Sequence, residues 1–275
     1  IYAYAPGKGR SNFMLTNSNQ SPEAHIFSAT VRKSFDNGLD MLAGYAYTYA
    51  EDVSPMTSSV AGSNFDNVAL SDIVEPSAAV SNYVVPHRFT FRLRYSNNFF
   101  GDNATRVSLY GFAQEGQAGS YVMSSSSLEA NQRFGRHLLY VPKGESDPNV
   151  VIDPTFDYAA FEKWRKGQGL GTGFVERNET NADWTYRMDL RVDQEVNLFG
   201  NTKGVVYAKI YNFTNFLNSD WGKINDAQFF SQQVVTSSID DQGRYVFERF
   251  SARDVNDLQE ERSLWEIRIG LSVKF

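Results

Sequence analysis

Apolar and polar side chains alternate over long stretches of this chain, and no other feature of the sequence constrains the fold as strongly. In the last segment, large apolar residues take every second position, and charged or small residues fill the positions between them. The apolar positions are Trp265, Ile267, Ile269, Leu271, Val273 and Phe275. Because successive side chains of a β-strand point to opposite faces, this period predicts a strand with one apolar face and one polar face.

Two earlier segments repeat this pattern. From Trp184 to Leu198, apolar residues alternate with polar or charged ones, and Gln194 is the single exception. From Phe89 to Tyr95, the residues between the apolar positions are arginine or threonine. Runs of about ten to sixteen residues are longer than ordinary strands and suit tilted strands that cross a bilayer, with aromatic residues at their ends.

The links between the expected strands alternate between short and long. We expect strands at 1–5, 25–35, 39–50, 87–96, 105–114, 184–199, 204–213, 228–238, 244–250 and 264–275. Short turns rich in Gly, Asn and Asp fall at 36–38, 101–103, 200–203 and 240–243. Long polar links fall at 51–86, 115–183, 214–227 and 251–263. This alternation predicts an all-β fold, a transmembrane antiparallel up-and-down β-barrel with long extracellular loops.

The composition agrees with a wall that has one apolar and one polar face. Aromatic residues make up 15% of the 275 residues, yet the mean hydropathy is −0.42. The sequence contains no run of about 18 apolar residues, so we expect no membrane-spanning helix. The net charge of −6 argues against nucleic acid as a partner. The chain opens at Ile1 as if within a strand, so we expect residues 1–275 to be the C-terminal portion of one barrel domain.

No residues in the sequence are spaced for catalysis or metal binding. His25, His87 and His137 are the only histidines, and cysteine is absent. Neither a metal-ligand spacing nor the glycine-flanked serine of an elbow-type hydrolase occurs. We therefore expect no catalytic residue, no metal and no cofactor.

The longest link is expected to have structure of its own. Asp153-Pro154 can begin a short helix that ends at Gly167. We expect this helix to pack on the barrel mouth, and the alternative is that it contacts a ligand. The extracellular loops 51–86 and 115–183 are the candidate ligand-binding regions.

Charged residues on the polar faces of the expected strands form a ladder. Inside a barrel these residues can pair across neighbouring strands or with a plug, or they can line a wet path for a solute. The apolar residues of the last segment would then face lipid. The expected lumen-facing residues are Arg88, Arg92, Arg94, Arg106, Arg187, Asp189, Arg191, Asp193 and Glu195.

Several segments, taken in order along the chain, resemble the C-terminal barrel of Oar-like TonB-dependent receptors. The closing segment 265–275 is similar to the C-terminal signal that the outer-membrane assembly machinery reads. The other segments are Tyr45-Ala46-Tyr47-Thr48-Tyr49-Ala50, Ser58-Ser59-Val60-Ala61-Gly62-Ser63-Asn64-Phe65, Ser81-Asn82-Tyr83, Pro86-His87-Arg88-Phe89, Leu138-Leu139-Tyr140-Val141-Pro142, Asp189-Leu190-Arg191-Val192-Asp193-Gln194-Glu195, Tyr211-Asn212-Phe213-Thr214-Asn215-Phe216-Leu217-Asn218 and Asp220-Trp221-Gly222.

The resemblance implies a barrel of about 22 strands in the bacterial outer membrane, of which this chain holds about the last ten. It also implies an N-terminal plug and TonB box outside this chain, with the TonB complex supplying energy. Implied partners are outer-membrane lipid and lipopolysaccharide, the rest of the barrel with its plug, and the assembly machinery. The expected function is the wall and extracellular loops of a transporter or receptor for an unidentified solute.

Two alternatives stay open at the level of sequence. The chain could be a complete small barrel enzyme, such as an omptin-like surface protease, for which His137 is the available loop histidine. It could also be a structural or adhesive outer-membrane protein that transports nothing.

Overall fold

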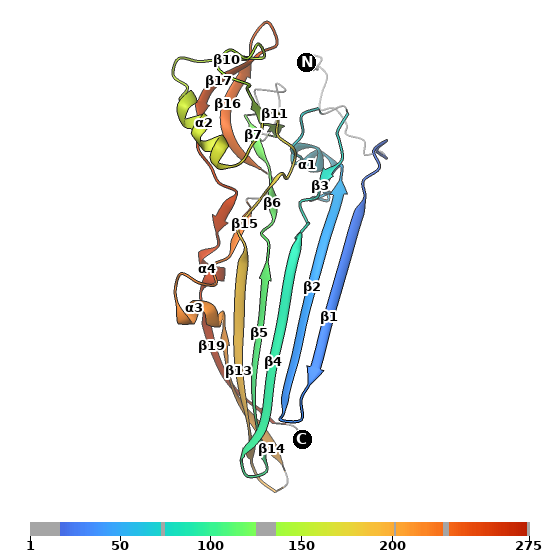
Figure 1. Ribbon diagram of the computed structural model, residues 1–275, viewed down its shortest axis with the longest axis vertical. Coiled ribbons are helices and arrows are strands. Elements are labelled where there is room, and N and C mark those ends of the chain that lie inside the picture. The colour runs from blue at the N-terminus through green and yellow to red at the C-terminus, as the bar shows by residue number, and fades with distance from the viewer. Residues whose placement is uncertain (1–16, 73–74, 125–135, 201, 228–230, 274–275) are drawn as a thin grey trace.

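Seven long strands form a curved sheet, which we call the wall sheet (Figure 1). A computed structural model describes residues 17–72, 75–124, 136–200, 202–227 and 231–273 of the chain. The strands lie in the order in which they occur in the sequence, and each is antiparallel to its neighbours. They are β1 (Ala24–Ser34), β2 (Leu39–Asp52), β4 (His87–Phe100), β5 (Asn103–Gln114), β13 (Thr185–Asn197), β14 (Lys203–Tyr211) and β19 (Glu266–Val273).

Three tight turns join neighbouring wall strands at one end of the molecule, as predicted (Figure 1). Each contains a glycine in the left-handed region, with φ of 87° at Gly38, 62° at Gly101 and 58° at Gly200. A side chain at Gly38 would also collide with the carbonyl of Ser96 on β4. These glycines let the chain reverse within a few residues and set the register of each hairpin.

The register places apolar residues in rows that cross the wall sheet. Met41 lies opposite Leu93, Leu93 opposite Leu109, and the row continues on the next three strands. Gln194, the exception in the alternation, lies on this apolar face and accepts a hydrogen bond of 2.6 Å from the Thr105 hydroxyl. One complete row is Met41, Leu93, Leu109, Leu190, Ile210 and Ile267.

A row of polar residues crosses the opposite face, and on each strand its member is the sequence neighbour of the apolar residue. It shares no member with the apolar row because the side-chain period of a strand is two. The row is Asp40, Arg94, Ser108, Arg191, Lys209 and Arg268. The wall sheet therefore has one apolar and one polar face across six strands.

The three long connections 53–86, 115–184 and 212–265 meet at the other end of the wall sheet and form what we call the head (Figure 1). Its main sheet has the order β10-β17-β16-β7-β8. These strands are β7 (Tyr121–Met123), β8 (His137–Leu138), β10 (Val150–Ile152), β16 (Gln232–Ile239) and β17 (Tyr245–Phe250).

Smaller elements complete the head. The short β3 (Ala79–Val80) pairs with the end of β2. Three further pairs are β6 (Ala118–Gly119) with β12 (Thr180–Asn181), β9 (Tyr140–Val141) with β11 (Gly173–Phe174), and β15 (Asn225–Ala227) with β18 (Asn256–Leu258). The helices are α1 (Ala61–Asp66), α2 (Tyr158–Gly167), α3 (Phe213–Leu217) and α4 (Glu260–Ser263). None of the helices in the described ranges is both long enough and apolar enough to span a membrane.

The hydrophobic core lies in the head. Val122, Leu139, Phe161 and Phe247 are all fully buried there. Helix α2 packs against the head sheet through the buried Phe161, and it ends at Gly167 as predicted. Its start was placed too early: the capping residue is Asp157, whose side chain accepts a hydrogen bond from the Ala160 amide, and not Asp153-Pro154.

Two strands expected in the wall belong to the head instead. Segments 228–238 and 244–250 correspond to β16 and β17, which pair with each other and with head strands. Their turn at 240–243 therefore lies in the head, and β14 pairs directly with β19. The consecutive buried residues Val234 and Val235 break the alternation of a two-faced wall strand, because both sides of β16 are covered.

The described wall therefore has seven strands along its path where about ten were expected. The expected strand at 1–5 lies outside the described residues. The antiparallel, all-β class is confirmed. Within the described ranges, β1 and β19 are the two edges of the wall sheet and do not pair with each other, so barrel closure stays a prediction.

Candidate functional site

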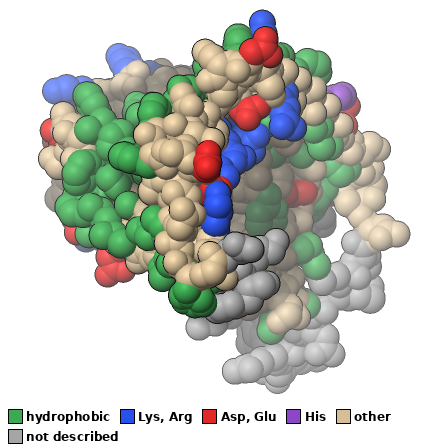
Figure 2. Space-filling model, turned by 90° about the horizontal axis from the view of Figure 1, so that it is seen from below, with side chains coloured by type: hydrophobic (Ala, Val, Ile, Leu, Met, Phe, Trp, Pro, Cys, Tyr) green, Lys and Arg blue, Asp and Glu red, His purple; other side chains and the backbone are tan. Residues whose placement is uncertain are grey.

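The polar face of the wall sheet gathers most of the charged residues that the strands carry. Seen from the end with the tight turns, Lys and Arg side chains gather along the hollowed side of the molecule (Figure 2). Hydrophobic side chains cover the outer side in the same view (Figure 2). The curvature of the sheet therefore places the polar face inside and the apolar face outside.

On one half of this face, from β5 to β19, cations are matched by carboxylates. Glu195 lies 2.5 Å from the Arg106 guanidinium and 3.5 Å from the Lys203 ammonium group. The pair of Arg191 and Asp193 is 2.6 Å apart, with two further contacts between the guanidinium and the same carboxylate. Such fork-shaped contacts fix both side chains on the sheet surface.

Asp189 extends the matched half toward the head. It lies 3.3 Å from Arg187 and 3.5 Å from Lys209. It also accepts a hydrogen bond of 2.9 Å from the backbone N–H of Asn212, where the third long connection begins. The last strand adds the pair of Arg268 and Glu266, at 2.6 Å.

Aromatic rings lie between these cations. The Arg191 guanidinium stacks over the Tyr207 ring at 4.3 Å, and the Lys209 ammonium lies 3.8 Å from the centre of the Tyr211 ring. Arg268 contacts the same Tyr211 ring at 4.8 Å. A cation over a ring face gains attraction from the ring quadrupole, so these rings hold the cations extended along the wall.

The other half of the polar face, from β1 to β4, carries cations without carboxylate partners. Arg88 donates a hydrogen bond of 2.6 Å to the Gln114 side chain and lies over the Phe112 ring. Arg32, Arg92 and Arg94 form no hydrogen bond or ion pair with any residue in the described ranges, and all three are exposed. Asp40, opposite Arg94, offsets only part of this positive charge, so the described chain leaves a net positive charge on this half.

The predicted ladder residues lie together on this one face. The structure groups Arg88, Arg92, Arg94, Arg106, Arg187, Asp189, Arg191, Asp193 and Glu195 there. Sequence reasoning missed Arg32, Lys209 and Arg268, which lie on the same face. The alternation of Tyr207, Lys209 and Tyr211 was the available signal. That this face lines a lumen stays a prediction.

The predicted lipid-facing residues lie at the apolar face. Ile267, Ile269 and Leu271 of β19 are 44%, 77% and 58% exposed, and Trp265 just before the strand is 46% exposed. Val273 is the last residue of the strand, and Phe275 lies outside the described residues. That lipid covers these residues stays a prediction.

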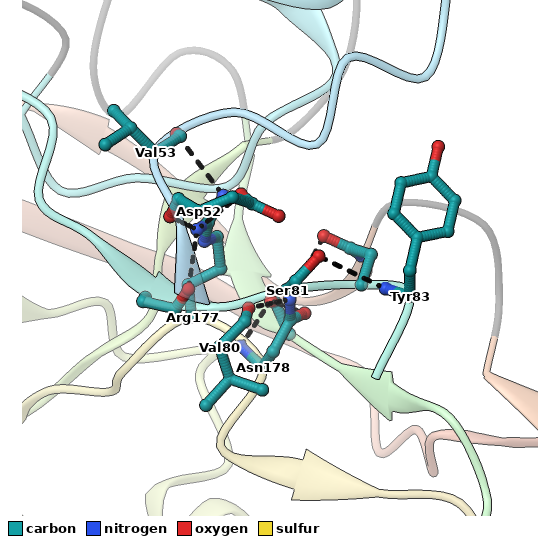
Figure 3. A network of polar contacts seen from close by, with 10 residues as sticks. Asp52, Val53, Val80, Ser81, Tyr83, Arg177 and Asn178 are labelled. Atoms are coloured by element: carbon teal, nitrogen blue, oxygen red, sulfur yellow. Dashed lines mark hydrogen bonds and ion pairs between the residues drawn. The ribbon is translucent and has the colours of Figure 1, made fainter. Parts of the chain in front are cut away.

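A buried polar network fastens the head to the wall sheet (Figure 3). Arg177, in the connection 115–184, lies 2.9 Å from the Asp52 carboxylate and donates hydrogen bonds to the Asp52, Val53 and Ala79 carbonyls. Burial lowers the pKa of Arg177, and the Asp52 charge opposes that shift. Loops 51–86 and 115–183, expected to bind ligand, are thus joined at the top of β2.

The adjacent Asn178 completes this network. Its φ of 60° lies in the left-handed region, and its amide group donates to the Val80 carbonyl at 2.7 Å and to the Asn82 side chain at 3.0 Å. Its backbone N–H donates to the Ser120 hydroxyl. Every one of these partners is buried or half-buried, so the network is structural.

His137, the loop histidine proposed for catalysis in the enzyme alternative, is buried in the head. Its Nδ1 lies 3.3 Å from the Leu70 carbonyl, an acceptor, so Nδ1 carries the proton and Nε2 accepts from the Tyr245 hydroxyl at 2.7 Å. Burial lowers the pKa of His137 to about 4. Burial also raises the pKa of Tyr245 to about 12, so the hydroxyl keeps its proton. No carboxylate in the described ranges contacts this imidazole.

His87 and His25 lie on the wall sheet. The Tyr45 hydroxyl is 2.9 Å from Nδ1 of His87, and Glu23 is 3.2 Å from Nε2 of His25. No group of three or more potential metal ligands occurs in the described part of the chain.

Comparison with protein-family models, with curated proteins and with solved structures gave no match.

Proposed function

We propose that this chain forms part of the wall and the outer loops of a TonB-dependent β-barrel transporter in a bacterial outer membrane. The wall sheet would cross the bilayer with its apolar face toward lipid and its polar face toward a wet interior. The head would lie outside the cell and the tight turns in the periplasm.

The uncovered apolar face is the observation that carries this proposal. Ile269 is 77% exposed at the centre of β19, while the fully buried core lies in the head. An antiparallel sheet normally packs one face on a core, and here no described element covers that face. Lipid is the environment that makes such a face favourable.

The lengths of the strands also support a wall sheet that crosses the bilayer. Strands β2 and β4 have 14 residues each, and β13 has 13. A tilted strand needs about 9–11 residues to cross a bilayer, so these strands can span it and extend beyond it. Short turns at one end and a large structured head at the other match the asymmetry of outer-membrane barrels.

The resemblance to Oar-like receptors supplies the transport part of the proposal. Transport would require a plug and contact with TonB, and other segments of the transporter would supply both. In this scheme the head captures the solute and the polar face forms the path along which it leaves the head.

Membrane fractionation tests the membrane part. The full-length protein should stay in the outer-membrane fraction after extraction with alkaline carbonate and should need detergent for release. A detergent-free, monodisperse protein would contradict the proposal.

Depletion of solutes from the growth medium tests the transport part. Medium used by the wild type, by a strain lacking this gene and by a strain lacking TonB should be compared by mass spectrometry. Transport predicts at least one solute that only the wild type depletes. If the gene deletion changes no solute, the structural or adhesive alternative is favoured.

A further inference from the structure

The cations on the β1–β4 half of the polar face differ from those on the matched half. From β5 to β19 the arginines and lysines are held by Asp189, Asp193, Glu195 or Glu266. Each of those carboxylates is already engaged by a cation of its own half. The described chain therefore leaves a local excess of positive charge on one side of the hollow.

The register brings three of these cations together. Arg32 on β1 and Arg92 on β4 both lie opposite Leu42 on β2, so about 10 Å separates their backbones across two strand spacings. Arg94 follows Arg92 on the same face about 7 Å along the strand. Long guanidinium side chains starting from these positions can reach one shared group.

Neutral hydrogen-bonding groups lie beside the three arginines. Tyr110 lies opposite Arg92 on β5 and is 43% exposed, and Ser108 lies opposite Arg94. Asp40 is the carboxylate opposite Arg94, and it accepts a hydrogen bond from the Ser34 hydroxyl without forming an ion pair with a described residue. The cluster thus combines three cations and one carboxylate with two hydroxyl donors, and its net charge is positive.

We propose that Arg32, Arg92 and Arg94, with Ser108 and Tyr110, bind an oxyanionic group, a phosphate or carboxylate, of the solute that crosses this barrel. Planar guanidinium groups bind such oxygens through paired hydrogen bonds, and hydroxyl groups can donate to the remaining lone pairs. This inference rests on the proposed function because it names the class of solute. A solute carrying several oxyanionic groups could move along the row toward Arg88.

Titration calorimetry on the full-length protein in detergent tests the proposal. Pyrophosphate and citrate serve as the phosphate and carboxylate probes, and sucrose serves as the neutral probe. Titrations at about 0.15 M salt screen charges further away than about 8 Å. The wild type should bind at least one of the two anions and should not bind sucrose.

The double variant R92Q/R94Q should weaken the affinity for that anion at least about tenfold, because each loss removes charge-assisted hydrogen bonds. The control E266Q/R268Q removes an ion pair from the last strand of the same face, further from the cluster, with no change in net charge. It should change the affinity less than about twofold.

Three results would overturn the proposal: no anion binding by the wild type, unchanged affinity in R92Q/R94Q, or an equal loss in the control. A loss of thermal stability in R92Q/R94Q without anion binding would assign these cations to an acidic segment of the protein instead. Recovery of every variant from the outer-membrane fraction is scored separately, so a failed membrane assignment is distinguished from failed anion binding.

Discussion

Asn212 is the residue where the third long connection leaves the wall sheet, and its side chain joins the start of that connection to its end. Its φ of 50° turns the chain out of β14. Its side-chain amide donates to the Gly222 carbonyl at 2.9 Å and to the Ser263 carbonyl at 2.7 Å, and its oxygen accepts from the Thr214 hydroxyl. A side chain at Gly222 would collide with this oxygen.

Replacing Asn212 with Ala should therefore destabilise the protein by about 2–4 kcal/mol, because two buried carbonyls lose their donor and alanine disfavours the left-handed region. The midpoint of thermal unfolding, read from heat-modifiable migration on gels, measures this change. The matched control is Asn218→Ala, at an exposed asparagine whose side chain contacts a nearby backbone N–H. Equal midpoints for the two variants would contradict the assigned role.

His137 makes the stability of the head depend on pH. Its folded pKa of about 4 lies below the usual value of 6.5, so the unfolded chain binds a proton more readily than the folded one. The stability that His137 contributes is complete above about pH 6.5 and is lost as the pH falls toward 4, in total about 3 kcal/mol.

Unfolding midpoints measured between pH 7 and pH 4 test this dependence. The variant His137→Gln should be less stable at pH 7 but should lose less stability on acidification than the wild type. A pH profile that the substitution leaves unchanged would show that other groups govern the acid sensitivity.

At the scale of a single strand, the two faces of β19 should respond differently to added charge. Ile269 lies on the apolar face and Ser272 on the polar face. Ile269→Arg should reduce stability in a bilayer by about 2–4 kcal/mol, the cost of arginine near the hydrocarbon midplane. Ser272→Arg should change it by less than about 1 kcal/mol. Urea unfolding in lipid vesicles compares the two variants, and equal effects would argue against a lipid-facing surface.

The sequence predicts the wall strands well because alternation and tight-turn residues are local signals. All seven wall strands and their three tight turns could be predicted in this way. The assignment of 228–238 and 244–250 failed because a hairpin inside the head has similar local chemistry. Pairing with β7 and β10 depends on contacts far apart in the sequence, and no local pattern reports it.

The candidate site was predictable only in part for a similar reason. The period of two places the ladder residues on one face, and that placement is observed. Which cations are matched depends on register between strands, as with Arg106 and Glu195, which are distant in the sequence. The ion pair between Arg177 and Asp52 at the end of β2 likewise depends on packing between segments that are far apart in the sequence.

At the scale of the whole molecule, Arg177 should control how the head sits on the wall sheet. Arg177→Lys keeps the charge but cannot reach all three carbonyls that the guanidinium contacts. We expect faster chymotrypsin cleavage within the connection 53–86, which contains Phe65 and Tyr83 but no lysine or arginine, while the wall sheet stays intact. The control Arg249→Lys, at an exposed head residue, should leave the cleavage rate unchanged. Equal cleavage rates for Arg177→Lys and the wild type would show that Arg177 does not fasten the head to the wall sheet.

The central claim is that hydrocarbon covers one face of the wall sheet and water the other. Because the chain contains no cysteine, spin labels can be placed on single introduced cysteines along β19 of the protein in bilayers. Labels at Ile267, Ile269 and Leu271 should be accessible to oxygen dissolved in lipid, and labels at Glu266, Arg268 and Ser272 to a water-soluble nickel chelate. The account would be contradicted if oxygen and nickel-chelate access did not alternate from one residue of β19 to the next. Free access of the nickel chelate to a label at Ile269 would also contradict it.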